Sequence, residues 1–289
     1  MSQRLKAELL LMLAAMIWGA TFVVVKDALA FATPSAFLAV RFTLAGILLF
    51  VLMSRGRLNA AVVGRGCLLG IFLYGGYLFQ TTGLLYTSPS KSAFITGFSV
   101  VLVPFLQAMH GFKIRKSTVA GAALGLAGIY LLVLPKGLVA VNRGDVLTLI
   151  ASCAFAVHIV LVGVYTRRHS FRQLVSIQIL VVGLLAFASW PLGMPFKITW
   201  TAGLVAAVLV TAVLATGFAF SVQNWAQQFT PPAHTALIFT LEPVFAALTS
   251  WVLLDERLGG RLFIGSALIL AGMVISEIWG GQQPSPVEG

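Results

Sequence analysis

Charged residues are scarce in this sequence. Asp, Glu, Lys and Arg make up only 9% of the 289 residues, whereas a soluble globular domain usually carries about 25%. Because charge keeps a protein surface wet, this scarcity means that most of the surface faces something other than water. Hydrophobic residues reach 59% and the mean hydropathy is +0.99, so the sequence predicts an integral membrane protein.

Several motifs that would support enzymatic chemistry are missing. The two cysteines, Cys67 and Cys153, lie in apolar runs with no Cys or His at metal-ligand spacing, so we interpret them as packing residues and expect no metal or cofactor. The sequence has no Gly-rich Lys-Ser/Thr motif for nucleotide binding, which argues against ATP as the energy source. It also has no His-Glu-x-x-His pair, which disfavours an intramembrane hydrolase.

Acidic residues are fewer than basic ones, with 8 Asp and Glu against 19 Lys and Arg. In a soluble protein this excess would suggest nucleic-acid binding. Here the basic residues lie mainly in short segments between apolar runs, so we interpret them as orientation signals and expect a lipid bilayer, not nucleic acid, as the partner. Their distribution favours a multi-pass protein of the cytoplasmic (inner) membrane with both termini cytoplasmic.

Ten apolar stretches have about the length that a spanning helix needs, roughly 20 residues. In lipid every backbone polar group must be satisfied internally, so each stretch should be helical. The expected spans are 8–30, 36–54, 66–86, 91–110, 117–135, 145–166, 173–192, 201–225, 233–254 and 261–279. The basic start followed by the first apolar run also resembles a signal peptide, but the run is long and is followed by Lys26 and Asp27, so we expect it to be retained.

An internal repeat relates the two halves of the chain. Gly121–Ile129 matches Gly265–Met273, and three further ordered matches pair Glu8 with Asp145, Gln80 with Gln223, and Lys91 with His234. We therefore predict one five-helix repeat over residues 1–141, a second over 142–280, and a disordered tail over 281–289. Because five is odd, equivalent helices would cross the membrane in opposite directions, as in secondary transporters with inverted repeats around a central cavity.

The repeat elements resemble the EamA-type permeases of the drug/metabolite transporter superfamily over nearly the whole chain. The residues that carry the resemblance are Trp18-Gly19-Ala20, Ala39-Val40-Arg41-Phe42, Tyr86-Thr87-Ser88-Pro89, Leu241-Glu242-Pro243-Val244-Phe245, Leu254-Asp255-Glu256-Arg257-Leu258 and the segment from Gly265 to Gly272. The resemblance implies ten helices, with the fifth and tenth peripheral, and the export of amino acids or other metabolites. One departure is that the first repeat has Ser99-Val100 where the second has Glu242-Pro243.

Ionisable groups inside a membrane are costly and usually face a cavity or a partner. Glu242 lies well inside the ninth span and is a candidate for proton coupling or amine binding, or else a buried acid beside a proline kink. Arg41 lies in the second span, where it can bind a carboxylate or reach the interface. Lys91 and His234, at equivalent helix starts, are candidates for gating contacts between repeats, or are simply exposed loop residues.

Polar and aromatic side chains mark the expected path. The third span and its partner, the eighth, are the most polar of the bundle, and His158 lies in the middle of the sixth span. Each of these residues can bind substrate or can simply pack or hydrogen-bond between helices. The candidate substrate-binding residues are Trp18, Tyr74, Tyr77, Gln80, His158, Gln223 and Asn224.

The sequence therefore predicts a secondary transporter, most simply an exporter of amino acids or related small metabolites that works by alternating access. Efflux of drugs or other metabolites is the first alternative, and a passive channel or membrane scaffold is a weaker one. A channel predicts flux that does not saturate, whereas a carrier predicts saturation and counterflow. The small-residue run at Gly121 and Gly125 favours helix packing and would also suit a homodimer through peripheral helices.

Overall fold

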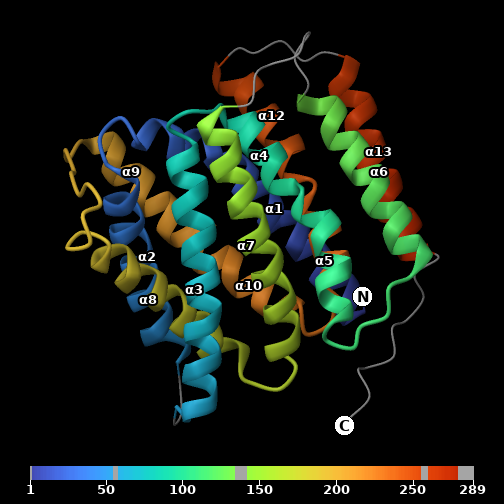
Figure 1. Ribbon diagram of the computed structural model, residues 1–289, viewed down its shortest axis with the longest axis horizontal. Coiled ribbons are helices and arrows are strands. Elements are labelled where there is room, and N and C mark those ends of the chain that lie inside the picture. Colours follow the sequence, from blue (N-terminus) through green and yellow to red (C-terminus); the bar gives the residue numbers. More distant parts are fainter. Residues whose placement is uncertain (1, 55–57, 134–141, 255–259, 279–289) are drawn as a thin grey trace.

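The computed structural model describes residues 2–54, 58–133, 142–254 and 260–278 (Figure 1). This part of the chain is helical apart from turns and one isolated bridge between Ala32 and Ile198. Its elements are α1 (Gln3–Ala28), α2 (Pro34–Met53), α3 (Ala60–Gly83), α4 (Pro89–Gly97), α5 (Ser99–Ala108), α6 (Lys116–Val133), α7 (Arg143–Tyr165), α8 (Phe171–Ala188), α9 (Ala202–Val210), η1 (Thr211–Phe218), α10 (Ala219–Ala226), α11 (Pro232–Phe239), α12 (Glu242–Leu254) and α13 (Gly260–Ile278).

Each predicted span coincides with one helix or with a run of consecutive helices. Eight segments are long and apolar enough to cross a membrane, and the remaining two predicted spans correspond to α6 and α13. The predicted tail over 281–289 lies outside the described residues, as does the Asp255–Arg257 part of the family motif. The molecule is therefore an all-α membrane protein.

Some helices begin earlier than hydropathy predicts because polar residues cap them. The Asn59 side chain accepts a hydrogen bond from the amide of Val62 at 2.8 Å, so α3 begins at Ala60, several residues before the predicted start of the third span. The Ser2 hydroxyl accepts from the amide of Leu5 at 3.2 Å and starts α1 at Gln3. Such caps satisfy amides that have no partner inside the helix.

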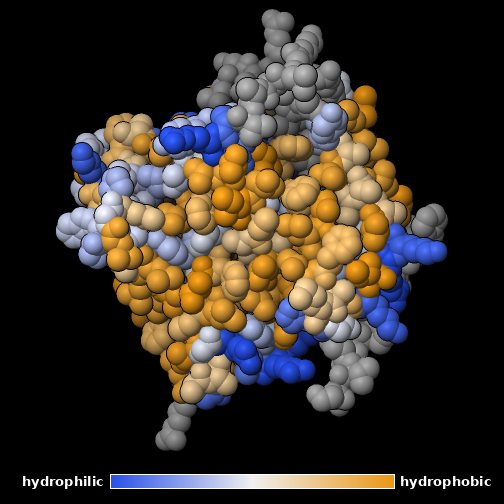
Figure 2. Space-filling model, viewed as in Figure 1, coloured by the Kyte–Doolittle hydropathy of each residue, from blue (hydrophilic) through white to orange (hydrophobic). Residues whose placement is uncertain are grey.

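A broad apolar belt covers the outside of the bundle. Figure 2 shows hydrophobic side chains over the middle of the visible face and hydrophilic ones gathered toward its upper and lower margins. Large apolar residues such as Val51, Leu184 and Phe263 are 65–73% exposed. A water-soluble monomer rarely exposes a continuous apolar surface of this extent, so the belt is the surface that contacts lipid.

Helices from the two halves of the chain pack against each other in pairs. Within the described part, α6 packs on α13, α2 on α8, α3 on α7 and α8, and α1 on α12 and α10. The α6–α13 pair lies side by side at one edge of the bundle, away from α2 and α8 (Figure 1). A Cβ on Gly272 would lie 2.7 Å from the carbonyl oxygen of Gly121, so the repeated glycine segments bring these two helices into close contact.

Two of the spanning segments are interrupted at equivalent positions. The α4–α5 segment breaks at Phe98, whose amide donates to the carbonyl of Ile95 at 3.1 Å. The α11–α12 segment breaks at Thr240 and Leu241, and the Leu241 amide donates to Ile238 at 3.1 Å. Each break replaces an i→i−4 bond with a tighter i→i−3 bond, and both breaks lie beside the central cavity.

Candidate functional site

A central cavity lies between the two halves of the molecule. Residues of both broken segments line it, and so do residues of α1, α2, α3, α7 and α10. Its polar lining consists of Thr21, Arg41, Gln80, Thr81, Thr96, Ser99, His158, Gln223 and Glu242, and its aromatic lining of Trp18, Phe22, Tyr77, Phe155, Phe220 and Phe239. A mostly apolar cavity with a few convergent polar groups is typical of a small-molecule site.

Glu242 reaches the cavity because the helix breaks immediately before it. It is the first residue of α12 and is 9% exposed. The next residue, Pro243, has no amide hydrogen to donate to the carbonyl of Phe239, which explains the interruption. Gly19 of α1 allows close approach, since a Cβ there would lie 2.5 Å from the Glu242 carbonyl oxygen. The carboxylate therefore sits at a helix N-terminus, where the helix dipole favours negative charge.

Arg41 supplies a positive charge to the same cavity. Its guanidinium is 2% exposed, donates from Nε to the Thr216 hydroxyl at 2.8 Å, and lies 5.0 Å from the ring centroids of both Phe42 and Tyr77. It therefore does not reach the membrane interface. The Thr216 hydroxyl and two aromatic rings hold the side chain, and a guanidinium offers five N–H groups in all.

A π-helical turn, η1, holds two side chains of the cavity lining. In η1 the hydrogen bonds widen, so that the Ala219 amide donates to the carbonyl of Leu214, five residues earlier. The turn provides two anchors: the Ala215 carbonyl accepts from the Trp18 indole at 2.7 Å, and the Thr216 hydroxyl accepts from Arg41. Short π-helical turns are frequent at functional sites. Nothing in the apolar sequence of this turn distinguishes it from an ordinary helix.

Aromatic rings form a continuous wall across the cavity. Trp18 contacts Phe220 and Phe239, with ring centroids 5.1 and 5.0 Å apart. Tyr77 contacts Phe155 at 5.3 Å and Phe220 at 6.0 Å. Tilted and edge-to-face pairs of this kind keep the rings in fixed orientations, so the cavity offers ring edges and faces to an apolar ligand group.

His158 is held by a chain of buried amides. The Asn224 amide nitrogen donates to the Phe220 carbonyl at 2.9 Å, which leaves Asn224 Oδ1 to accept from Gln178 Nε2, also at 2.9 Å. Gln178 Oε1 then faces His158 Nε2 at 2.6 Å. Because that oxygen can only accept, His158 Nε2 carries a proton. Gln178 was not among the sequence candidates, since one glutamine in an apolar helix gives no signal of its partner.

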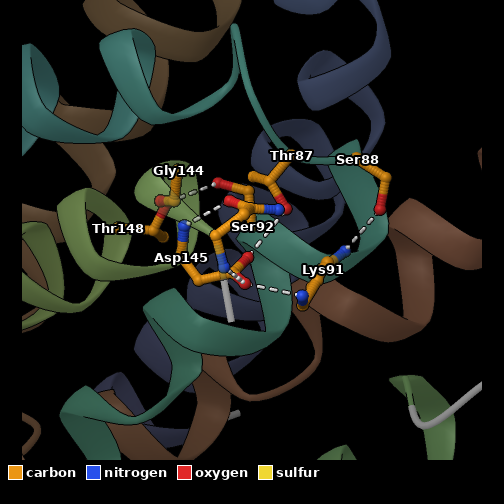
Figure 3. A network of polar contacts seen from close by, with 8 residues as sticks. Thr87, Ser88, Lys91, Ser92, Gly144, Asp145 and Thr148 are labelled. Carbon is orange, nitrogen blue, oxygen red and sulfur yellow. Dashed lines mark hydrogen bonds and ion pairs between the residues drawn. The ribbon is translucent and has the colours of Figure 1, made fainter. Parts of the chain in front are cut away.

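Lys91 lies away from the cavity, in a polar network at the start of α7 (Figure 3). Its ammonium is 2.6 Å from Asp145 Oδ2, and the Thr87 hydroxyl donates to Asp145 Oδ1 at 3.0 Å. Asp145 and Asn142 also form a reciprocal capping box at the N-terminus of α7. The network therefore joins the start of α4 in the first half to the first helix of the second half.

His234 lies in the corresponding contact near the N-terminus of the chain. Its Nε2 is 3.4 Å from Glu8 Oε1, which also accepts from Arg4 Nε at 2.9 Å. The contact is an ion pair only when the imidazole is protonated. The repeat pairs Glu8 with Asp145 and Lys91 with His234, so each half contributes one acidic and one basic partner, and the two contacts are equivalent by sequence.

Seven of the eleven candidates predicted from the sequence line the cavity, and four lie outside it. Trp18, Arg41, Tyr77, Gln80, His158, Gln223 and Glu242 line the cavity. Tyr74 lies one turn before Tyr77 and packs in the apolar cluster formed with α2 and α8 instead. Asn224 is fully buried behind Phe220, and Lys91 and His234 form the two end contacts. Thr21, Thr96 and Ser99 line the cavity but were not among the candidates.

The described residues contain no group of three or more His, Cys, Asp or Glu that could hold a metal ion. The polar groups of the cavity come instead from single residues on different helices. Such an arrangement can bind and orient a small molecule through charge, hydrogen bonds and ring contacts.

Comparisons with known proteins agree with this architecture. The profile of the EamA-like transporter family matches residues 5–134 and again residues 142–277. An uncharacterized transporter of Archaeoglobus fulgidus is 34% identical over 96% of this chain and 87% of its own length. The uncharacterized transporter YoaV of Bacillus subtilis is 23% identical over 90% of this chain and 93% of its own. A crystal structure with 20% identity covers 95% of this chain and 97% of its own, with a TM-score of 0.78.

The family match and the transporter relatives, together with a multi-pass helical bundle, identify a membrane transporter and not an enzyme. The chain belongs to the EamA-like transporter family.

Proposed function

We propose that this protein is a secondary transporter of amino acids or closely related small metabolites. The observation that carries the proposal is that Arg41 and Glu242 line the same cavity. An amino acid has a carboxylate that suits a guanidinium and an ammonium group that suits a carboxylate. The rings of Trp18, Tyr77 and Phe220 offer an apolar surface to its side chain.

Alternating access accounts for the two end contacts. Lys91–Asp145 joins α4 to α7, and His234–Glu8 joins α11 to α1, so each contact ties one half of the chain to the other. We assign them as the two gates of the cavity, which open in turn. This assignment fits a molecule built from residues 1–141 and 142–280 as two inverted repeats, in which the halves exchange conformations.

The distribution of Lys and Arg supports an orientation in the membrane. The excess of Lys and Arg in alternate connecting segments supports placement in the cytoplasmic membrane with both termini inside. In that orientation the His234–Glu8 contact is the cytoplasmic gate. We assign the direction as export. The outer faces of α6 and α13, which expose Tyr130 and Phe263 beside the bundle, are the surfaces we propose for a homodimer.

Efflux of drugs or other amphipathic metabolites is the second candidate. The specific observation in its favour is the largely aromatic lining, which binds many apolar ring systems without demanding a carboxylate. Dependence of transport on Arg41 separates the two candidates, because only a carboxylate substrate needs the guanidinium.

Counterflow in proteoliposomes tests the proposal. Vesicles are preloaded with unlabelled Phe, Trp, Thr and Met, and the entry of each labelled amino acid is followed. We expect transient accumulation in the wild type and a loss of about 10- to 150-fold in Arg41→Met, since a charge-assisted hydrogen bond contributes about 1.5–3 kcal/mol. The matched control is Arg65→Met, because Arg65, near the start of α3, contacts Tyr165 and does not line the cavity.

Two results would contradict the amino acid assignment. One is the absence of accumulation with folded protein in the vesicles. The other is accumulation that Arg41→Met leaves intact, which would indicate a substrate without a carboxylate and favour the efflux of amphipathic molecules.

A further inference from the structure

Two glutamines of the cavity occupy equivalent places in the two halves. Gln80 lies near the end of α3 and Gln223 near the end of α10, and the internal repeat pairs them. Both are buried, with exposed fractions of 8% and 1%, and both line the cavity. A buried carboxamide offers one acceptor oxygen and one donor nitrogen, so which end faces the cavity determines what it can bind.

The orientation of the Gln223 side chain is fixed by two consecutive hydrogen bonds, the second of which ends on a backbone carbonyl. Gln227 Nε2 donates to the Ile159 carbonyl at 2.8 Å, and a carbonyl can only accept. Gln227 Oε1 therefore faces Gln223 and accepts from its Nε2 at 3.1 Å. This leaves Gln223 Oε1 as a buried acceptor with no hydrogen-bond partner among the described residues. An acceptor in that state is costly unless a ligand supplies a donor.

The orientation of Gln80 is fixed in a similar way. The Thr96 hydroxyl donates to the Ser92 carbonyl at 2.9 Å, so its oxygen is available as an acceptor. Gln80 Nε2 donates to that oxygen at 2.8 Å. Its donor nitrogen is thus engaged by Thr96, and no described residue donates to Gln80 Oε1. The two halves use different hydrogen-bond partners and leave the same group, the carboxamide oxygen of a cavity-lining glutamine, without a donor among the described residues.

We propose that Gln80 Oε1 and Gln223 Oε1 form a binding site for a ligand group with several N–H donors, namely a primary ammonium. The inference rests on the proposed function and specifies its substrate further: the ammonium end lies between the glutamines and the carboxylate end at Arg41. Glu242 adds a carboxyl group to the cavity, while the two carbonyl oxygens require hydrogen-bond donors. A quaternary amine or an anion has no donor to offer them.

Four probes of one skeleton test this directly on the purified full-length protein, with binding followed by ligand-dependent thermal stabilisation. Phenylalanine has both charged groups, phenethylamine has only the ammonium, phenylpropionate has only the carboxylate, and the trimethyl betaine of phenylalanine has a cation without N–H groups. We expect the last two probes to bind at least about tenfold more weakly than phenylalanine. Size cannot explain the weak binding of phenylpropionate, since it is smaller than phenylalanine.

Variants then assign the effect to the glutamines. Gln223→Leu and Gln80→Leu should each weaken phenylalanine binding by about tenfold and leave phenylpropionate binding unchanged. Each variant would then lose the preference for phenylalanine over phenylpropionate. A merely structural role would weaken both probes equally. Gln228→Leu is the matched control, because Gln228 is on the same stretch of chain, bonds to the Trp225 carbonyl and does not line the cavity.

The outcomes separate this inference from the proposed function. Phenethylamine binding without phenylalanine binding would keep the ammonium site and remove the amino acid assignment. Equal binding of phenylalanine and phenylpropionate, or of phenylalanine and its betaine, would overturn the ammonium site and leave a carrier of carboxylates. A preference that survives both leucine variants, or failure of both ammonium probes to bind folded protein, would also overturn the site.

Discussion

The two broken segments share their geometry but differ in chemistry. In both, an amide at the break donates to an isoleucine three residues earlier, and the next residue lines the cavity. That residue is Ser99 in the first half and Glu242 in the second. The repeat thus provides two similar helix interruptions, and one substitution gives the cavity an acid on one side only. The shared helix break and the single acid can therefore be tested separately by mutation.

Neutralising the acid should have the largest effect. We expect Glu242→Gln to lower counterflow by about 100-fold or more, because a carboxylate retained within a membrane is costly and here has a helix N-terminus to favour its charge. The isosteric amide keeps the shape of the cavity. Ser99→Ala, the equivalent change in the first half, should lower counterflow by only about twofold, as expected for the loss of one neutral hydroxyl.

Comparable losses in the two variants would show that the break itself, and not the acid, limits transport. The measurement is the initial rate of counterflow, normalised to the amount of folded protein in each vesicle preparation.

The helical spans and the repeat could be predicted because lipid imposes a simple rule on sequence. Long apolar stretches must be helical, and an ionisable residue within one has to face a cavity or a partner. That rule led to Arg41 and Glu242, which both line the cavity. The pairing of Lys91 with His234 came from the repeat, and the structure adds their partners, Asp145 and Glu8.

Other features were not predictable because they depend on contacts between distant helices. The π-helical turn lies in an apolar stretch whose composition suits an ordinary helix. Gln178 gains its role only because Asn224 and His158 lie on either side of it. Tyr74 shares a helix face with Tyr77 but lies one turn before it, outside the cavity lining, and helical periodicity alone does not show where a cavity ends.

The polar contacts at the two ends of the molecule also differ from each other. Lys91–Asp145 is a close ion pair at 2.6 Å between permanently charged partners, whereas His234–Glu8 spans 3.4 Å and shares its acid with Arg4. We therefore expect Lys91→Met to open its end of the cavity. Cysteine placed at Thr21, a cavity residue, in a background with Cys67→Ala and Cys153→Ala reports opening through labelling by an impermeant maleimide.

Labelling through the Lys91 end should rise by about tenfold in Lys91→Met, equivalent to about 1.4 kcal/mol for a partly buried pair. Labelling through the Glu8 end, measured in vesicles of the opposite orientation, serves as the internal control and should not rise. An equal rise at both ends would indicate a general loosening of the bundle and would remove the gate assignment.

The smallest effect is expected from making the two ends alike. His234→Lys replaces an imidazole with a permanent cation opposite Glu8, so the contact becomes an ion pair at every working pH. Because Glu8 already accepts from Arg4, the added pair contributes only about 0.2–1 kcal/mol, so labelling through the Glu8 end and the rate of counterflow should both fall by about two- to fivefold. His234→Gln, which keeps a hydrogen-bonding group without the charge, should not reproduce this fall. If His234→Lys instead raised labelling or left counterflow unchanged, the contact would be a packing feature of α1 and α11, and only the Lys91 end would remain a gate.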